Sequence, residues 1–321
     1  MHTEKAIEVV GLRQRYGDFE AVRGVSLEVR PGELFALLGT NGAGKTTTLE
    51  TLEGYRSAHA GTVRVLGRDP HRDRREVRPS VGIMLQEGGF FADLTVAETI
   101  DVWRDLTPRA RDRAELLELA GLLKQEKVRV RQLSGGQKRR LDLALAIVGH
   151  AKVLFLDEPT TGMDPEARGD TWQIIRDLVA DGTTVLLTTH YLEEAEQLAD
   201  RLAIMHQGRI EIAGTVGEVL AGHGDRIGFR VPPQLPVAEL PSLTLPAPSG
   251  SSVDAQVAVN GGQTVATYRL TEEAGLQHAL GELLRWADER DLRLSGLQVR
   301  SASLEDVFLH VVGHTTGEDD R

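Results

Sequence analysis

Residues 33–47 read ELFALLGTNGAGKTT. The first part, Glu33 to Leu38, is almost continuously apolar, which is the pattern of a strand buried on both faces of a sheet. The second part matches the glycine-rich P-loop pattern, and a helix is expected to begin near Lys45. A strand before the loop and a helix after it distinguish this motif from the alternative, a glycine-rich turn without chemistry. The segment therefore predicts a phosphate-binding α/β domain.

The P-loop also predicts how a nucleotide is held. Its glycines let the backbone curl so that successive N–H groups point inward, and the N-terminus of the next helix adds to this cradle for anionic oxygens. Lys45 is expected to neutralise charge on the β- and γ-phosphates, and Thr46 to place its hydroxyl on Mg²⁺. The expected nucleotide-binding residues here are Gly39, Thr40, Asn41, Gly42, Ala43, Gly44, Lys45, Thr46 and Thr47.

Further strands and helices follow along the chain. Two more buried apolar runs lie at residues 153–156 and 184–188, and helical patterns occupy residues 171–180 and 192–199. Buried strands that alternate with amphipathic helices predict a mostly parallel α/β sheet. The segment from Thr95 to Gly149 reads as successive helices without a buried strand, so we expect an α-helical insertion there, at about residues 92–150.

Acidic and imidazole side chains follow two of these strands. Asp157 and Glu158 end the run that begins at Val153, at the carboxyl end of the strand, where open parallel sheets carry their sites. Asp157 is suited to hold Mg²⁺ through its water shell, and Glu158 to polarise the water that attacks the γ-phosphate. The alternative is an acidic cap on the next helix. His190 ends the following strand, where it either hydrogen-bonds the γ-phosphate or is a structural or exposed histidine.

Length and composition limit the classes of protein to which the chain can belong. With 321 residues, 40% of them hydrophobic, the chain is long enough for one large unit and a smaller one. A formal net charge of -11 disfavours non-specific nucleic-acid binding. The basic clusters at residues 72–78 and 138–140 are interpreted as solvated faces. The sequence contains no cysteine, which excludes disulfides, thiolate-bound zinc, iron–sulfur clusters and thiol catalysis.

The sequence predicts no signal peptide and no membrane span. The N-terminus carries Glu4, Lys5 and Glu8 instead of an apolar core, and no stretch approaches about 18 continuous apolar residues. We therefore expect a cytoplasmic protein whose membrane role, if it has one, comes through a partner.

A second, smaller domain is expected after a proline-rich segment at residues 222–250, which suits neither a helix nor a central strand. Strand patterns at residues 255–259 and 265–270 flank Asn260-Gly261, a hairpin signal. A helix from Glu272 to about Arg290, a strand near residues 292–299 and a helix with a Ser303–Asp306 capping box follow. The predicted domains are residues 1–222, a small α+β domain at residues 223–313, and a polar tail at residues 314–321.

Residues Leu133 to Gln137 read LSGGQ, and here the sequence resembles the ABC ATPase family. Six motifs of the family occur in the family's order over roughly residues 5–220. They are Walker A (Gly39 to Thr47), the Q-loop (Gln86), the signature (Leu133 to Gln137), Walker B (Val153 to Glu158), the D-loop (Thr161 to Asp164) and the H-loop (His190). Tyr16 matches the aromatic A-loop residue that stacks on adenine. The resemblance implies a P-loop NTPase cassette with a RecA-like, mostly parallel sheet and an antiparallel β edge.

The resemblance also implies an assembly. In the family, the signature of one subunit and the P-loop of the other sandwich ATP, so a homodimer is expected to bind two ATP molecules with Mg²⁺. The signature residues lead into a predicted helix, which again offers N–H groups to an anion; a capped helix start is the alternative. On this basis the site also includes Ser134, Gly135, Gly136, Gln137 and Asp164, and Gln86 is both a metal ligand and a reporter of nucleotide state.

Residues 304–309, LEDVFL, and the small domain before them resemble the daunorubicin-resistance type of ABC-2 export ATPases. This implies export of a drug-like or lipophilic molecule through a separate transmembrane subunit, with this chain peripheral on the cytoplasmic face of the membrane. Phe90 and Phe91 are either part of the groove for the transport subunit or core residues. The alternative function, a soluble ABC ATPase acting on ribosomes or DNA, is disfavoured by the single cassette and the acidic balance. A module that holds ATP without turnover is disfavoured by Glu158 and His190.

Overall fold

The computed structural model describes residues 5–86, 88–221, 224–232, 235–244, 252–253, 255–260, 263–270 and 275–315. The chain forms two units, Met1–Val216 and Gly217–Arg321. Each unit has its own apolar core.

The larger unit is built around a six-stranded sheet in the order β5-β6-β7-β3-β8-β9. Neighbouring strands are parallel except β8 and β9, which pair antiparallel. Every residue of β3, β6 and β7 is buried, which confirms that their apolar runs mark strands covered on both faces. The strands are β3 (Leu34–Gly39), β5 (Val81–Met84), β6 (Val153–Asp157), β7 (Thr184–Thr189), β8 (Arg201–His206) and β9 (Arg209–Thr215).

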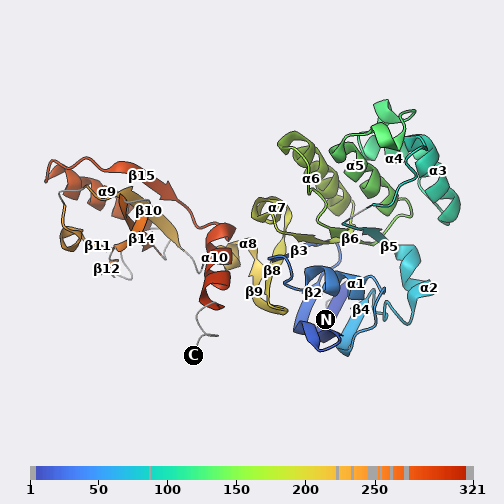
Figure 1. Cartoon of the computed structure of the whole chain (residues 1–321), viewed down its shortest axis with the longest axis horizontal. Helices are drawn as coiled ribbons and strands as arrows, with labels where there is room; N and C mark the ends of the chain where they lie inside the picture. The colour runs from blue at the N-terminus through green and yellow to red at the C-terminus, as the bar shows by residue number, and fades with distance from the viewer. Residues whose placement is uncertain are drawn as a thin grey trace. The chain divides into compact units, whose positions relative to one another are not determined.

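Different layers cover the two faces of this sheet (Figure 1). Helices α6 and α7 lie on one side; helix α1 and a three-stranded antiparallel sheet, in the order β2-β1-β4, lie on the other. Apolar side chains of this second layer share a core with Phe35, Phe155 and Leu186 of the central strands. The antiparallel β edge expected from the resemblance is therefore present. The elements are β1 (Ile7–Tyr16), β2 (Phe19–Val29), α1 (Lys45–Leu52), β4 (Ala60–Val65), α2 (Arg74–Val77), η1 (Arg78–Ser80), α6 (Pro165–Ala180) and α7 (Leu192–Leu198).

The described residues between β5 and β6 form helices and no strand, as expected for the insertion. The first of these helices begins at a capping box in which Thr95 and Glu98 exchange hydrogen bonds. The elements are α3 (Val96–Leu106), α4 (Arg113–Leu119), η2 (Leu123–Gln125), η3 (Val130–Gln132) and α5 (Gly135–Ala146).

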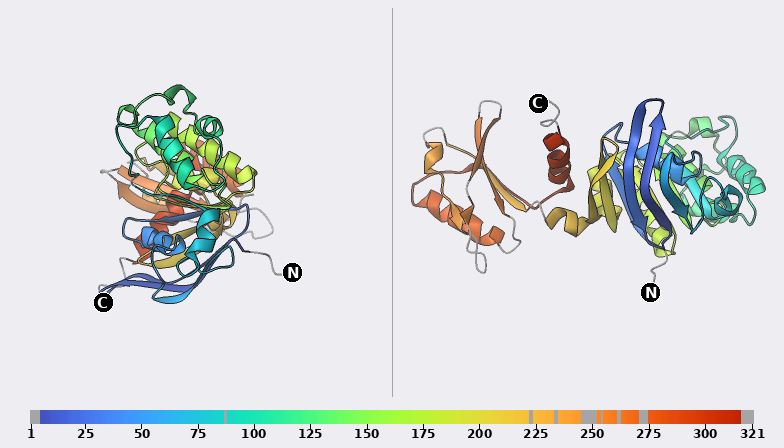
Figure 2. Two further views of the ribbon diagram at one scale, coloured as in Figure 1. Left: turned by 90° about the vertical axis from the view of Figure 1, so that its right-hand side faces the viewer. Right: turned by 90° about the horizontal axis from the view of Figure 1, so that it is seen from below.

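The smaller unit is a four-stranded antiparallel sheet in the order β13-β14-β10-β15. Helix α9 lies along one face of it (Figure 2), and Ala279 and Leu283 of this helix share a core with Ile227, Phe229 and Tyr268 of the sheet. The elements are α8 (Val216–Ala221), β10 (Asp225–Arg230), η4 (Val237–Glu239), β11 (Leu243–Thr244), β12 (Ser252–Val253), β13 (Gln256–Asn260), β14 (Gln263–Leu270), α9 (Gly275–Asp288), β15 (Ser295–Arg300) and α10 (Leu304–Thr315).

Several predicted boundaries differ from the structure. Asn260 is the last residue of β13 and pairs with Gln263, so it is not a central turn residue as the Asn-Gly signal suggested. The start of the helix predicted at Glu272 and most of the predicted polar tail lie outside the described residues. Strands β4, β5, β8, β9 and β10 have no counterpart in the prediction. None of the helices in the described ranges has both the length and the apolar character of a membrane span.

Candidate nucleotide site

The P-loop joins β3 to α1, as its sequence predicts. Gly44 has a φ of 101°, which L side chains rarely adopt. A Cβ at Gly44 would lie 2.6 Å from the carbonyl oxygen of Ala21, and one at Gly39 would lie 2.6 Å from that of Met205. Neighbouring backbone therefore encloses the loop so closely that only glycine fits at both positions.

Lys45 lies inside this loop, with only 5% of its surface exposed. Its Nζ donates to the carbonyl oxygens of Gly39, at 2.7 Å, and Thr40, at 3.2 Å. Burial lowers the pKa of Lys45, while the nearby carboxylates of Glu158 and Asp157 raise it. Two neutral backbone carbonyls of the P-loop thus hold the ammonium group in place.

Asp157 ends β6 beneath the loop and is buried. Burial raises the pKa of Asp157, and hydrogen bonds from the Thr188 and Thr46 hydroxyls oppose this increase. The Thr188 hydroxyl donates to Asp157 Oδ1 from the adjacent strand β7. Sequence reasoning missed Thr188, because only the pairing of β6 with β7 places it opposite Asp157.

Glu158 adopts a φ of 49°, which is uncommon for a residue other than glycine. Its Oε1 lies 3.2 Å from His190 Nδ1, and its Oε2 accepts from the Thr161 hydroxyl at 3.1 Å. The N-cap of the next helix, α6, is Asp164, which accepts from the Ala167 N–H. Glu158 is therefore not the acidic helix cap that the sequence left open, and the structure brings it together with His190.

Arg139 contradicts the interpretation of residues 138–140 as a solvated charge run. Only 11% of its side chain is exposed. Its guanidinium donates to four backbone carbonyls at 2.6–3.0 Å, those of Leu85, Gln86, Asp157 and Glu158. One side chain of α5 therefore ties the segment around Gln86 to the end of β6. A run of basic residues gives no sign of these hydrogen bonds in the sequence, because the acceptors are main-chain groups of distant segments.

The same turn of α5 contacts the chain just after Gln86. Asp142 lies against Gly88, where a Cβ would meet Asp142 Oδ1 at 2.3 Å. Burial raises the pKa of Asp142 to about 6, although Arg139, 3.7 Å away, lowers it. The Gln86 side chain itself is exposed.

Tyr16, at the end of β1, lies beside the P-loop helix. Its hydroxyl is 3.3 Å from Thr47 Oγ1 and 3.5 Å from Glu50 Oε2. The Arg56 guanidinium lies over the ring, 4.8 Å from its centroid, and 42% of the tyrosine is exposed. The ring thus lies beside the P-loop helix, with Arg56 over one of its faces.

The signature residues lead into α5; Ser134 and Gly135 are exposed, whereas Leu133 is buried. Ser134 and Gln137 form a capping box, which satisfies two N–H groups of the helix start. Gly136 lies against the start of α6, where a Cβ would meet Ala167 Cβ at 3.0 Å. No hydrogen bond joins the signature to the P-loop within the described part of this chain. Beyond Gln86, Phe91 is 62% exposed and is therefore not a core residue.

Comparison with known proteins agrees with this arrangement. The family model for ABC transporters matches residues 22–161, and the model for the C-terminal domain of ABC transporter domain-containing proteins matches residues 225–303. The daunorubicin resistance ATP-binding protein DrrA3 of Streptomyces coeruleorubidus is 38% identical over 318 residues, which cover 97% of this chain and 96% of that protein. The Nod factor export ATP-binding protein I of Paraburkholderia xenovorans (strain LB400) is 40% identical over 315 residues, which cover 97% and 98%.

Solved structures resemble the larger unit. The structure of cbiO1 from Clostridium perfringens, part of the ABC transporter complex cbiONQ, matches with a TM-score of 0.61 and 26% identity, over 68% of this chain and 91% of that one. The nucleotide cradle, the family models and the near full-length relatives agree. The chain therefore belongs to the ABC transporter family, as an ATP-binding and ATP-hydrolysing subunit of the export type.

Proposed function

We propose that this subunit hydrolyses ATP with Glu158 as the base that activates water. The observation that carries this proposal is the contact of Glu158 with His190 next to the loop that holds Lys45. The Thr161 hydroxyl and the His190 imidazole each engage one carboxylate oxygen, which fixes the orientation of the group. A carboxylate held in this way can take a proton from water while Lys45 stabilises charge on the phosphates.

The residues at this site fit a magnesium ion. Thr46 and Asp157 offer a hydroxyl and a carboxylate beneath the loop, which are oxygen ligands of the kind Mg²⁺ prefers. Gln86 is the third expected ligand, and Arg139 holds the backbone of this residue. When bound, Mg²⁺ would neutralise part of the charge of the β- and γ-phosphates. Tyr16 would stack on adenine at the edge of the same cradle.

A second copy of the chain would complete the site. Ser134 and Gly135 are exposed, and the signature has no hydrogen bond to its own P-loop in the described residues. This supports a dimer in which Ser134, Gly135 and Gly136 meet the ATP held by the partner. Asp164 caps α6 beside the signature, so its contribution would be to position the D-loop segment. Two ATP molecules would then hold the halves together, and hydrolysis would release them.

The relatives suggest the wider setting. The names of the similar proteins refer to daunorubicin resistance and to Nod factor export. We therefore place this chain on the cytoplasmic face of the membrane, bound to a separate transmembrane subunit that exports a drug-like or lipophilic molecule. The exposed Phe91, beside the segment held by Arg139, is the candidate contact for that subunit.

Glu158→Gln tests the proposed role. The substitution keeps the size and hydrogen-bonding ability of the side chain but removes the base, so steady-state ATP hydrolysis should slow by about 10² to 10⁴ while ATP binding persists. With Mg²⁺ and ATP the variant should form a stable dimer in light scattering. Glu166→Gln, on the first turn of α6, is the matched control and should leave hydrolysis near that of the original protein. Hydrolysis by Glu158→Gln at the original rate would remove Glu158 from the mechanism.

A further inference from the structure

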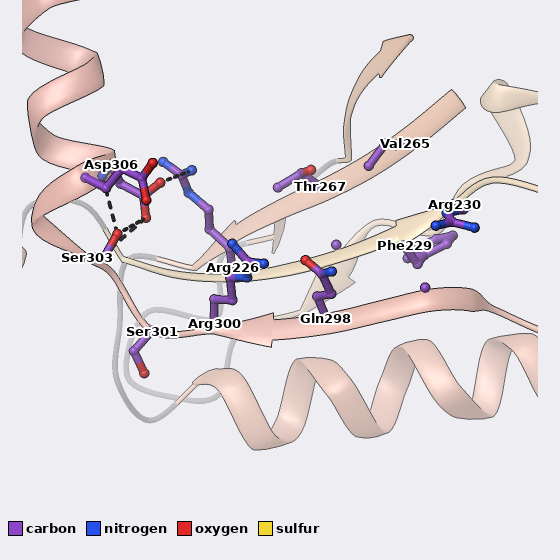
Figure 3. Close-up of a pocket in the computed structure, with 13 residues that line it drawn as sticks. Arg226, Phe229, Arg230, Val265, Thr267, Gln298, Arg300, Ser301, Ser303 and Asp306 are labelled. Carbon is purple, nitrogen blue, oxygen red and sulfur yellow. Dashed lines mark hydrogen bonds and ion pairs between the residues drawn. The ribbon is translucent and has the colours of Figure 1, made fainter. Parts of the chain in front are cut away.

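The smaller unit carries a polar cavity of about 680 Å³ on one face of its sheet. Side chains alternate along β10: Ile227 and Phe229 pack into the core with α9, so Arg226, Gly228 and Arg230 point to the opposite face. This opposite face lines the cavity (Figure 3). Nothing in the nucleotide site accounts for it, because every lining residue belongs to the smaller unit.

Strand register places three arginines in one row across this face. Arg226 of β10 pairs with Arg269 of β14 on one side and with Arg300 of β15 on the other. Residues directly opposite each other on antiparallel strands share a face, with Cβ atoms about 5 Å apart, and like charges in such pairs are destabilising. This arginine row therefore costs stability in the absence of a compensating anion.

Acidic side chains compensate the row only in part, because Glu305 and Asp306 of α10 also line the cavity. Asp306, held by Ser303 at the start of α10, forms an ion pair with Arg226 at 2.5 Å. Across the described ranges, neither Arg269 nor Arg300 has an ion pair. Of the row, Arg226 and Arg300 line the cavity. With Arg230 they bring three positive charges against two carboxylates, so the lining is net positive and suits an anionic ligand.

Gly228, next to the row, keeps the floor of the cavity open. A Cβ at this position would find its nearest neighbours, Ala266 O and Thr267 Oγ1, at 3.8 Å, so packing does not demand glycine. Glycine inside a strand lowers its stability and often marks the close approach of a ligand. At the other end of the cavity, Arg230 lies over Gly296, where a Cβ would be 3.2 Å from Arg230 Nε.

We propose that this cavity binds a small phosphorylated molecule, with its phosphate group between Arg226 and Arg300. Arginine presents planar, paired N–H donors that match phosphate oxygens, which makes it better suited to this group than a point charge. The volume lies within the range of about 300–1,000 Å³ that is typical of small-molecule sites. Thr267 and Gln298 provide neutral hydrogen-bonding groups for the remainder of the ligand. The site is separate from ATP hydrolysis and does not depend on the role given to Glu158.

Calorimetric titration of the full chain with phenyl phosphate tests the proposal. The P-loop also binds phosphates, so it is first saturated with Mg²⁺ and a non-hydrolysable ATP analogue. We expect one binding event per chain in the smaller unit. Arg300→Gln should weaken it at least about tenfold, as for the loss of a charge-assisted hydrogen bond. Gly228→Leu should weaken it similarly with all charges retained. Arg285→Gln, an exposed arginine of α9, is the control and should leave it unchanged.

Several outcomes would overturn the proposal. One is the absence of binding; another is the same affinity in Arg300→Gln and Gly228→Leu as in the original chain, with thermal unfolding showing that both variants are folded. An equal loss in Arg285→Gln would mean non-specific attraction. If only vesicles containing phosphatidic acid bound, and not phenyl phosphate, the face would serve a membrane; if only an acidic peptide bound, it would serve a protein. Because the variants leave the P-loop intact, failure of the nucleotide site would not imitate any of these results.

Discussion

The two units of this chain differ in how far their charged side chains are buried and paired. In the larger unit, which holds the nucleotide site, the charged side chains of the site are buried or nearly so. Each has a hydrogen-bond or ion-pair partner at short range; these residues are Lys45, Asp157, Glu158 and Arg139. In the smaller unit, Arg226 and Arg269 of the row are half-buried and Arg300 is exposed, and within the described residues a carboxylate pairs only with Arg226. Buried charges must be satisfied by the protein itself, whereas exposed charges can be left for a ligand.

This contrast predicts opposite responses to removal of a charge. In the nucleotide unit the loss of a charged group should leave its partners unsatisfied and impair both stability and function. In the smaller unit the loss of Arg269 or Arg300, which have no ion pair in the described residues, should relieve repulsion.

Lys45→Ala should have the largest effect. The substitution removes the ammonium group that Gly39 and Thr40 hold in the P-loop, and ATP affinity should fall by about a hundredfold. Fluorescence titration with a labelled nucleotide measures this. Arg300→Gln serves as the control, since it lies in the other unit and should bind ATP normally. An unchanged ATP affinity in Lys45→Ala would mean that the lysine does not contact phosphate.

Arg139→Gln should have the second largest effect. Four carbonyl acceptors lose a charged donor, so the free energy of unfolding should fall by about 2 kcal/mol, as for buried groups left unsatisfied. The kcat for ATP hydrolysis should drop roughly tenfold while ATP affinity changes little. Arg140→Gln, whose partner Asp170 is exposed, is the matched control. Equal stability of the two variants would contradict the role assigned to Arg139.

Glu53→Gln tests a buried carboxyl group near the site. Burial, together with Asp157 and Glu50, raises the pKa of Glu53 from 4.5 to about 8, and its Oε1 has no hydrogen-bond partner. Between these pH values the folded chain retains a proton that the unfolded chain has released, so stability falls as pH rises from 4.5 to 8. At pH 8 the variant should be about 1–3 kcal/mol more stable, and near pH 4.5 about equal. Denaturant unfolding at both pH values checks this.

Glu118→Gln, at an exposed position on α4, is the control for Glu53→Gln. It should change the free energy of unfolding by the same amount at both pH values. A parallel pH dependence of stability in the original chain and in Glu53→Gln would show that Glu53 does not contribute to it.

Arg300→Gln should have the smallest effect on stability and the opposite sign to Arg139→Gln. It removes one member of a like-charged pair on opposed strands, so the free energy of unfolding should rise by no more than about 0.5 kcal/mol at low salt, and by less at high salt. Thermal unfolding at two salt concentrations measures this. A clear loss of stability would mean that a partner inside the protein compensates Arg300.

The sequence predicts the central strands and the P-loop turn better than the strand ends of the smaller unit. The P-loop, the buried strands and the carboxylates at the end of β6 are local features. Each is recognised from residues that lie within a few positions of each other in the sequence. Arg139 was assigned to a solvated face, since a run of basic residues carries no sign of distant carbonyl acceptors. In the smaller unit, Asn260 was placed in a turn, but strand pairing assigns it to β13.

Elements with local causes follow from the sequence: the P-loop between strand and helix, and helix starts such as the Ser303 capping box. Which distant residues meet follows from the fold of the whole unit. Thr188 reaches Asp157 through the pairing of β7 with β6, and Arg226 meets Arg269 and Arg300 through strand register. The physical reason is that backbone conformation follows from neighbouring residues, whereas strand pairing and burial depend on the packing of the whole unit.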